Sequence, residues 1–280
     1  MGQLLIAGEW VDGTSAERLH DKYTGAAYGD MAVASPAQVA AAVAGAVRGQ
    51  ERATLTPYGR FKVLSAAARI IESRVEPLIE LMRHEAGFTR ADGDNEVRRC
   101  VQTLELSAEE AKRLNGDMVP MHAGDGVKDR IGFTMRAPRG VICAITPFNA
   151  PVNTVAHKVA PALAAGNAVI VKPSSSTPNA TNLIAQALMD AGLPEGLISV
   201  VHGGAKVAHA LAKIEGLGRN FYRAVLACYA DDAGLVVAHQ APWYRFDPVR
   251  LRPRSRQSGC VRTHHMRPPC GRSRAGVAIA

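Results

Sequence analysis

Three short segments of this sequence carry residue types that can bind a ligand or assist a reaction. They are Thr146-Pro147-Phe148-Asn149-Ala150-Pro151, Lys172-Pro173-Ser174-Ser175-Ser176 and Gly203-Gly204. The Asn149 carboxamide can donate a hydrogen bond to a developing oxyanion. Lys172 and the serines after it can bind a sugar or a phosphate, and the glycine pair permits a ligand to come close to a helix start.

Each segment also has a purely structural interpretation. Asn149 can satisfy backbone groups of a turn, and Lys172 can extend to water beside serines that cap a helix. A lone glycine pair is weaker evidence than the Gly-x-Gly-x-x-Gly pattern of dinucleotide sites. Residue types and spacing alone leave both interpretations open.

All three segments follow apolar runs of the kind found in buried parallel strands. The runs are GVICAIT from Gly140, NAVIVKP from Asn167 and LISVVHGG from Leu197. Helical patterns that open at Pro151, at Thr177-Pro178 and in AKVAHALAK alternate with them. This alternation predicts a parallel sheet with right-handed crossovers. Ligands of such sheets bind at the carboxyl ends of the strands, where the three polar segments lie.

The first 138 residues predict helices and short strands. Leu4–Val11 alternates loosely and ends at Asp12-Gly13, which indicates a short strand or a hairpin arm. Three helices are expected: one capped by Ser35 with Gln38, one that starts at Thr56-Pro57, breaks near Pro77 and ends at Gly87, and one over about 94–114. Alternation between about Val127 and Arg136 predicts a further hairpin.

Charge is distributed unevenly along the 280 residues. The whole chain has 33 Lys and Arg and 25 Asp and Glu, a net charge of +8. Residues 219–280 hold 11 Arg, no Lys and 3 Asp, which leaves 33 − 11 = 22 basic and 25 − 3 = 22 acidic residues before them. We therefore predict an N-terminal part over 1–138, the first half of a ligand-binding sheet domain over 139–218, and a divergent basic tail over 219–280.

The tail admits three interpretations. Its clustered Arg, Pro and Cys residues lack a helical or alternating period beyond about Val237, which favours a segment that does not fold, such as an out-of-frame translation. A basic arm for nucleic acid is disfavoured because Lys is absent and no aromatic side chain lies among the final arginines. A metal site is disfavoured because the spacings of its candidate ligands match no zinc pattern: Cys260, His264, His265 and Cys270.

Composition excludes several other classes of protein. With 47% hydrophobic and 21% charged residues the chain is typical of a globular protein. No apolar run approaches the length of about 18 residues that would span a membrane. The N-terminus has no basic region of the secretory type, so we expect a cytoplasmic protein without membrane contact.

The motifs together resemble the aldehyde dehydrogenase superfamily. The resemblance covers most of residues 1–215, from the opening IAGEW and the helix end HEAG to the run from PRGVICAITPFNAP through KPSSSTP to AGLPEGLISVVHGG. It implies a Rossmann-like α/β fold preceded by helices and a β-hairpin oligomerisation arm. It also implies oxidation of a small aldehyde with NAD or NADP, in a homo-oligomer assembled through the N-terminal arm.

The resemblance assigns roles to particular residues. It implies that Asn149 binds the oxyanion, that the backbone of Ile145, Thr146, Pro147 and Phe148 lines the nicotinamide-ribose side, and that Lys172 binds the adenosine ribose. Ser174, Ser175 and Gly204 complete the expected cofactor site. Many NAD-preferring relatives have a Glu where this chain has Ser175. The absence of that carboxylate removes repulsion toward a 2′-phosphate, so we expect NADP to be tolerated.

The chain departs from the family pattern after Gly216–Asn220. Relatives continue with segments that carry a general-base Glu and a nucleophilic Cys, and neither can be recognised here. Cys260 resembles the nucleophile segment only faintly, whereas Cys100 and Cys143 are interpreted as residues of a helix and of the core. We therefore expect weak cofactor binding and an inactive, truncated or frame-disrupted chain. The alternative is a non-catalytic fragment that docks on full-length relatives.

Overall fold

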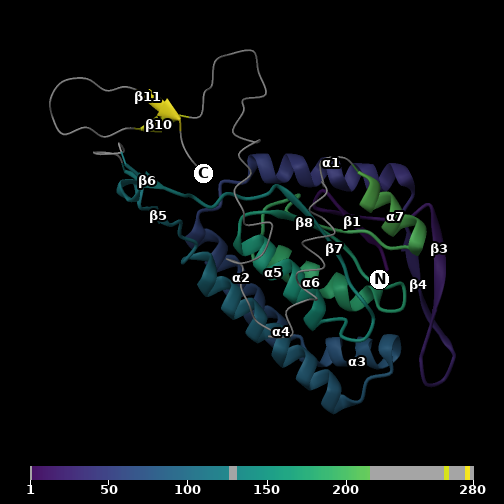
Figure 1. Cartoon of the computed structure of the whole chain (residues 1–280). Helices are drawn as coiled ribbons and strands as arrows, with labels where there is room; N and C mark the ends of the chain where they lie inside the picture. The colour runs from purple at the N-terminus through teal and green to yellow at the C-terminus, as the bar shows by residue number, and fades with distance from the viewer. Residues whose placement is uncertain (1, 126–130, 215–261, 265–274, 278–280) are drawn as a thin grey trace. The chain divides into compact units, whose positions relative to one another are not determined.

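The structure is a computed structural model that describes residues 2–125, 131–214, 262–264 and 275–277 (Figure 1). These residues belong to two units. The first contains the described parts of Met1–Arg113 and Pro138–Trp243, and the second contains those of Leu114–Ala137 and Tyr244–Ala280. All of the candidate site residues lie in the first unit.

A five-stranded sheet forms the centre of the first unit, with the order β2-β1-β9-β8-β7. Strands β7, β8 and β9 are parallel, as the three apolar runs predict, and β1 and β2 continue the sheet in the antiparallel sense. Their bounds are Leu4–Ile6 for β1, Glu9–Val11 for β2, Val141–Ile145 for β7, Ala168–Lys172 for β8 and Ile198–Val200 for β9.

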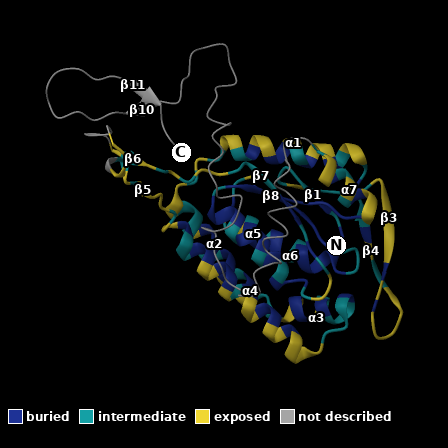
Figure 2. Cartoon of the chain, in the orientation of Figure 1, coloured by how far each residue is buried: buried dark blue, intermediate teal, exposed yellow. Residues whose placement is uncertain are grey.

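Helices cover both faces of this sheet. Figure 1 shows α1 (Pro36–Arg52) and α7 (Ala205–Lys213) on one face and α5 (Asn153–Ala164) and α6 (Pro178–Asp190) on the other. Behind α5 and α6 pack α2 (Pro57–Ser73), α3 (Val75–Ala86) and α4 (Arg90–Ala111). Strands β8 and β9 are buried along their whole length, whereas the outer sides of α1 and α4 are exposed (Figure 2). This is the layered arrangement expected of an α/β protein.

Local capping signals in the sequence position several helix ends. The Ser35 hydroxyl accepts a hydrogen bond from the Gln38 backbone at 3.2 Å, and the Gln38 side chain accepts one from the Ser35 backbone at 3.0 Å. This confirms the predicted capping box. At α2 the Thr56 hydroxyl accepts a hydrogen bond from the Gly59 amide, a cap without the reciprocal bond. Gly87 ends α3 with φ of +72°, a left-handed conformation that favours glycine.

Three helix boundaries differ from the prediction. The chain breaks between α2 and α3 at Arg74, and Pro77 lies in the first turn of α3, where a missing N–H leaves no helical hydrogen bond unmade. Pro151 was expected to open a helix, but α5 begins two residues later at Asn153. The third predicted helix, over about 94–114, is α4, which begins earlier, at Arg90.

The hairpin expected over Leu4–Val11 is confirmed, whereas its role as an oligomerisation arm stays a prediction. Strand β1 of this hairpin pairs with β9 through Leu5 and Val200, so the hairpin is part of the main sheet. A second hairpin, β3 (Ser15–His20) with β4 (Ala27–Val33), was not predicted. Its turn contains Thr24-Gly25, a signal that the sequence does offer.

The second unit contains short antiparallel pairs. Strand β5 (Met118–Val119) pairs with β6 (Gly132–Phe133), and the short 3₁₀ helix η1 (Met121–Ala123) lies between them. Of the hairpin expected over about 127–136, only β6 lies in that range, and its partner β5 comes earlier in the chain. Strands β10 (Arg262–His264) and β11 (Ala275–Val277) also pair, where no regular structure was expected. The rest of the predicted unfolded tail lies outside the described residues.

Candidate functional site

The carboxyl ends of β7 and β8 lie side by side. Ile145 is the register partner of Lys172, and the Thr146 amide donates to the Lys172 carbonyl at 3.1 Å. On the other side of β8, the Val201 amide donates to the Val171 carbonyl at 2.9 Å. Two of the predicted site segments, those at Thr146 and Lys172, therefore meet at one edge of the sheet, and the third follows the neighbouring strand.

Lys172 is a buried cation at this edge. Its side chain is 6% exposed, and Nζ donates to the Pro173 carbonyl at 2.8 Å. Burial lowers the pKa of Lys172 because it disfavours the charged form. An ammonium group has three donors, and no carboxylate among the described residues forms an ion pair with this one. Lys172 thus has donors left for hydroxyl or phosphate oxygens.

Thr146 is buried next to this lysine. Its side chain is 4% exposed, and the hydroxyl Oγ1 has no hydrogen-bond partner among the described residues. A buried hydroxyl without a partner costs free energy, and this one can exchange a hydrogen bond with a ligand at the carboxyl edge of the sheet. Ile145 before it is half-buried, and its carbonyl accepts a hydrogen bond from Lys158 Nζ at 2.7 Å.

The loop after β7 carries the remaining residues of the first segment to the surface. Pro147 is half-buried, Phe148 is 60% exposed, and Asn149 is exposed. The Asn149 carboxamide forms no hydrogen bond with a described residue, so the interpretation in which it satisfies a turn has no support there. Its assignment as an oxyanion donor stays a prediction.

The serines after β8 have two different environments. Ser174 has a structural role, because its hydroxyl accepts a hydrogen bond from the Ser176 amide at 3.2 Å and its carbonyl accepts one from the Thr177 amide at 3.1 Å. Ser175 is half-buried and forms no side-chain hydrogen bond with a described residue. The hydroxyls of Ser175 and Ser176 are therefore the ones in this turn without a hydrogen bond to a described residue, and Ser175 is available to a ligand.

The two glycines after β9, Gly203 and Gly204, have different roles. Gly203 has φ of +139°, and a Cβ there would lie 2.5 Å from Val207 Cγ2, so the backbone requires glycine. Gly204 is exposed and forms the N-cap of α7, and a Cβ on it would meet nothing within 4 Å. The open space expected at a ligand site is therefore at Gly204.

Neither described cysteine suits nucleophilic chemistry. Cys100 and Cys143 are both buried, and burial raises the pKa of each thiol far above neutral pH. A thiolate is the reactive form, so both are core residues, as the sequence indicates. Cys260 lies outside the described residues.

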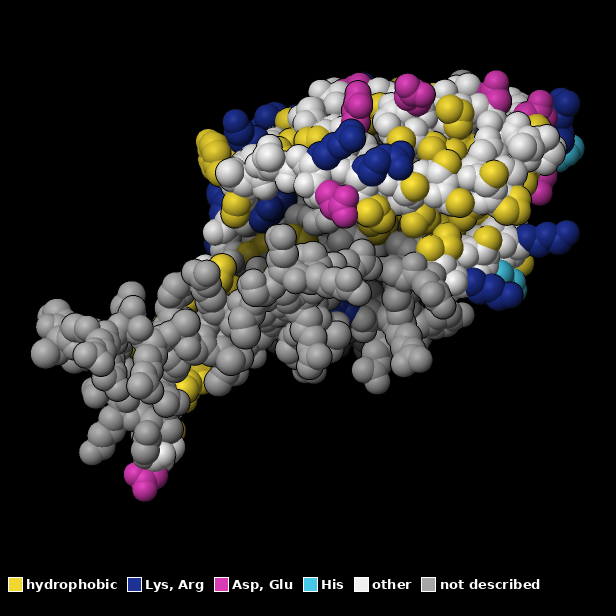
Figure 3. Space-filling view, turned by 90° about the horizontal axis from the view of Figure 1, so that it is seen from above, with side chains coloured by type: hydrophobic (Ala, Val, Ile, Leu, Met, Phe, Trp, Pro, Cys, Tyr) yellow, Lys and Arg dark blue, Asp and Glu magenta, His cyan; other side chains and the backbone are white. Residues whose placement is uncertain are grey.

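A metal site and a membrane span are likewise not found in the described part of the chain. No group of three potential ligands gathers there, and no described helix is long and apolar enough to cross a membrane. Of the proposed metal ligands, Cys260, His265 and Cys270 are not described, and His264 is placed only as backbone in β10. Seen from above, the first unit has Lys and Arg side chains interspersed with Asp and Glu rather than a basic patch (Figure 3).

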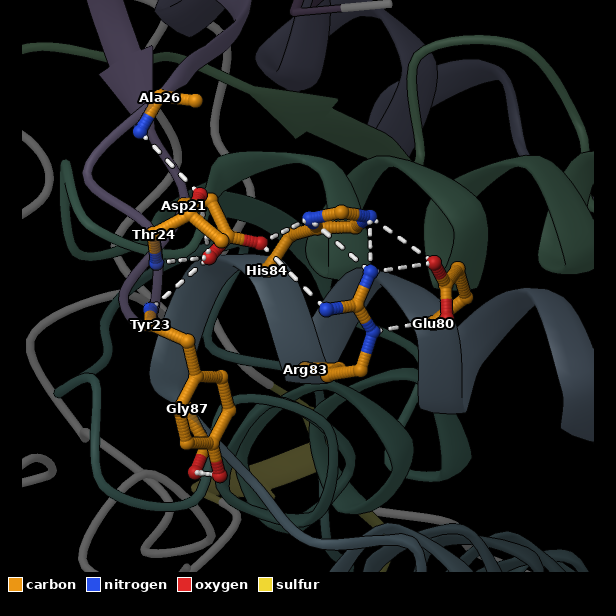
Figure 4. Close-up of polar contacts among 8 residues, drawn as sticks. All are labelled: Asp21, Tyr23, Thr24, Ala26, Glu80, Arg83, His84 and Gly87. Carbon is orange, nitrogen blue, oxygen red and sulfur yellow. Dashed lines mark hydrogen bonds and ion pairs between the residues drawn. The ribbon is translucent and has the colours of Figure 1, made fainter.

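A polar cluster attaches the β3–β4 hairpin to α3 (Figure 4). Asp21 in the turn accepts hydrogen bonds from the Tyr23 and Thr24 amides, and its other oxygen lies 2.5 Å from His84 Nδ1. The Thr24 amide, His84 and the Tyr23 amide together hold the pKa of Asp21 well below its usual range. Glu80 and Arg83 of α3 pair beside His84. The cluster is on the surface and has an evident structural role.

Glu85, the residue after His84, was also missed by the sequence analysis. Its carboxylate is fully buried and accepts hydrogen bonds from the Asn179 amide at 2.9 Å, the Ala180 amide at 3.2 Å and the Tyr28 hydroxyl at 3.2 Å. Burial nevertheless raises the pKa of Glu85 to about 7. No local pattern indicates this contact, because its partners are 94 and 95 residues away along the chain.

These features define an α/β protein with a Rossmann-like parallel sheet that presents at its carboxyl edge a buried lysine and a threonine whose hydroxyl has no hydrogen-bond partner among the described residues. The chain belongs to the aldehyde dehydrogenase family, whose pattern it matches over residues 10–218.

The relatives found for this chain are all longer than the matched part. A 3-sulfolactaldehyde dehydrogenase of Priestia aryabhattai is 42% identical over 202 residues, which cover 71% of this chain and 42% of the relative. An aspartate-semialdehyde dehydrogenase 1 of Pseudomonas canavaninivorans is 46% identical over 159 residues, which cover 57% and 34% of the two chains. The chain therefore spans less than half the length of the curated relatives it matches.

Solved structures agree with this family membership. An NADP-dependent glyceraldehyde-3-phosphate dehydrogenase from Bacillus halodurans C-125, complexed with NADP, is 34% identical with a TM-score of 0.73, over 77% of this chain and 46% of that chain. PnpE in complex with nicotinamide adenine dinucleotide is 30% identical with a TM-score of 0.71, over 76% and 44%.

Glu85 makes the stability of the fold depend on pH. Its pKa is about 7 in the fold and 4.5 as the reference value, so between these values the folded chain binds more protons than the unfolded chain. The free energy of unfolding should therefore fall as pH rises from about 4.5 to 7, by up to about 3 kcal/mol. Glu85→Gln should remove this part of the pH dependence in denaturant titrations. An unchanged dependence in the variant would contradict the assignment.

Proposed function

We propose that this chain forms the dinucleotide-binding part of an NAD(P)-dependent aldehyde dehydrogenase. The observation that carries the proposal is the pairing of β7 with β8, which sets the buried Lys172 beside the unpartnered Thr146 hydroxyl. Both groups suit the hydroxyl-rich and phosphate-rich surface of a dinucleotide. When bound, that cofactor would accept the hydride from the aldehyde.

In this proposal the described residues have distinct tasks. Lys172 donates to the adenosine ribose, with Ser174 and Ser175 in the following turn, and Gly204 leaves room for the cofactor at the start of α7. The segment from Ile145 to Phe148 lines the nicotinamide-ribose side. Asn149, exposed and without a partner among the described residues, donates to the oxyanion of a small aldehyde substrate.

The buried cysteines support the further proposal that the 280-residue chain does not turn over aldehydes. Oxidation in this family needs a thiolate nucleophile and a base that activates water. Cys100 and Cys143 cannot supply the thiolate from the core, and Asn149 can stabilise an oxyanion without forming a covalent bond. We therefore propose a cofactor-binding chain without turnover of its own.

Assembly with other copies or with longer relatives is the second candidate function. It is favoured by the β5–β6 hairpin, on which four large apolar side chains are more than half exposed: Met118, Ile131, Phe133 and Met135. Such side chains are typical of a surface that another chain covers. We propose a homo-oligomer to which both this hairpin and the N-terminal segment indicated by the sequence resemblance contribute contacts.

Removal of the Lys172 ammonium group should weaken binding of both dinucleotides. We expect Lys172→Met to lower the affinity for NAD and NADP at least tenfold in titration calorimetry, because about 1.4 kcal/mol or more is typical of a charge-assisted hydrogen bond. Lys62→Met on α2 is the matched control and should leave both affinities unchanged. Equal affinities for the wild type and Lys172→Met would contradict the proposed site.

The identity of residue 175 should determine the response to the 2′-phosphate. We expect the wild type to bind NADP at least as well as NAD, although weakly. Ser175→Glu should weaken NADP binding about tenfold or more through charge repulsion while NAD binding is retained. The two dissociation constants, measured at one ionic strength, test this expectation. A strong preference of the wild type for NAD would refute the argument from the absent carboxylate.

Turnover of aldehydes by this 280-residue chain should be undetectable. We expect no formation of reduced dinucleotide by the purified chain with a panel of simple aldehydes, measured by absorbance after removal of full-length relatives. Enzymatic turnover that Cys260→Ala abolishes would overturn this proposal and identify Cys260 as the nucleophile.

A further inference from the structure

The buried carboxylate of Glu85 takes the place of a cap at the start of α6. Thr177 precedes this helix but its side chain makes no capping hydrogen bond. The amides of Asn179 and Ala180, two of the first N–H groups of α6, donate instead to Glu85 of α3. A helix leaves its first four amides without intrahelical partners, so Glu85 satisfies two of these from a different element.

The start of α6 is joined directly to the ligand edge of the sheet. Lys172 ends β8, and the turn after it is closed by the hydrogen bond from the Thr177 amide to the Ser174 carbonyl. Helix α6 begins at the next residue, Pro178. A contact that fixes the first turn of α6 therefore also fixes the turn that holds Ser174 and Ser175.

We propose that Glu85 is a positioning residue for the dinucleotide site. In its ionised form Glu85 holds the start of α6, and the start of α6 in turn holds the Ser174–Ser176 turn. The affinity for the cofactor therefore rises with pH through the neutral range. The inference rests on the proposed cofactor site at Lys172. The carboxylate can accept hydrogen bonds from all three donors, the amides of Asn179 and Ala180 and the Tyr28 hydroxyl. In the protonated acid one oxygen carries a proton and becomes a donor, so these hydrogen bonds are fewer or weaker.

The groups around Glu85 are almost all neutral. Tyr28 of β4 donates its hydroxyl, and the Asn179 carboxamide of α6, whose Oδ1 has no hydrogen-bond partner among the described residues, also interacts with the carboxyl group. Two titratable groups adjoin Tyr28: His84 stacks on the Tyr28 ring and contacts Asp21. The described residues of α4 place no hydrogen bond or ion pair on Glu85. Its pKa of about 7 puts its ionisation in the neutral range.

Two opposite pH effects follow from this geometry and can be separated. Burial penalises the charged carboxylate, so the stability of the whole fold falls as Glu85 ionises. The hydrogen bonds from Asn179, Ala180 and Tyr28 are strengthened by the same ionisation, so the turn beside Lys172 becomes better ordered. A merely structural role for Glu85 would change stability and leave the pH dependence of cofactor binding untouched.

The test is the affinity of the full chain for NAD between about pH 6 and pH 8. NAD is used because a 2′-phosphate titrates near pH 6 itself. For the wild type we expect binding to tighten about two- to fivefold, the effect typical of a charge at a helix N-terminus. Glu85→Gln, which keeps the size of the side chain, should bind with the low-pH affinity of the wild type throughout. Tyr28→Phe should move the midpoint to higher pH.

The outcomes distinguish this inference from the proposed function. Equal pH slopes for the wild type and Glu85→Gln would overturn the inference and leave the cofactor site standing. If neither protein binds NAD at any pH, the proposed function fails. The backbone amide resonances of residues 174–177, Asn179 and Ala180 in the wild type then decide whether Glu85 positions this segment. A common titration near pH 7 at Asn179, Ala180 and the serine turn supports the positioning role, and its absence overturns it.

Discussion

The arrangement of the first unit depends on the complete burial of β8. Strands β7 and β9 pair with the backbone of β8 on its two edges, and helices α1 and α5 cover its two faces. Every residue from Ala168 to Lys172 is therefore buried. A strand in this position must be apolar along its length. A charged side chain fits only at its carboxyl end, where polar groups such as the Pro173 carbonyl can accept its hydrogen bonds. Lys172 is therefore held by the most rigid part of the sheet rather than by a loop.

The last turn of α3 connects three parts of the fold. His84 faces the Asp21 turn of the β3–β4 hairpin, and Glu85 faces the start of α6. The Lys22 amide donates to the His84 carbonyl, and the Tyr23 hydroxyl donates to the Gly87 carbonyl. Because neighbouring residues of one helix contact both the hairpin and α6, a hairpin that lies mostly at the surface is fastened close to the helix that follows the candidate site.

The sequence predicted those parts of this fold that depend on local or short-range patterns. Apolar runs identified β7, β8 and β9, and Ser35 with Gln38 identified the start of α1. The pairing of β1 with β9 and the contact of Glu85 with α6 could not be predicted, because each joins residues far apart along the chain. In the candidate site, the position of Lys172 beside Thr146 followed from strand order. Lys158 was missed because a single lysine on an apolar helix gives no sign of where its ammonium group lies.

The pairing of Leu5 with Val200 has a consequence for the order in which the chain is made. The partner of β1 is synthesised 195 residues after β1 itself, and at roughly 5–20 residues per second this delay is about 10–40 s on the ribosome. During that interval Leu4 and Leu5, both fully buried in the finished protein, have no β9 to pack against. The amino-terminal hairpin is therefore among the first segments of this chain to be made, and β1 cannot take its place in the main sheet until β9 has been synthesised.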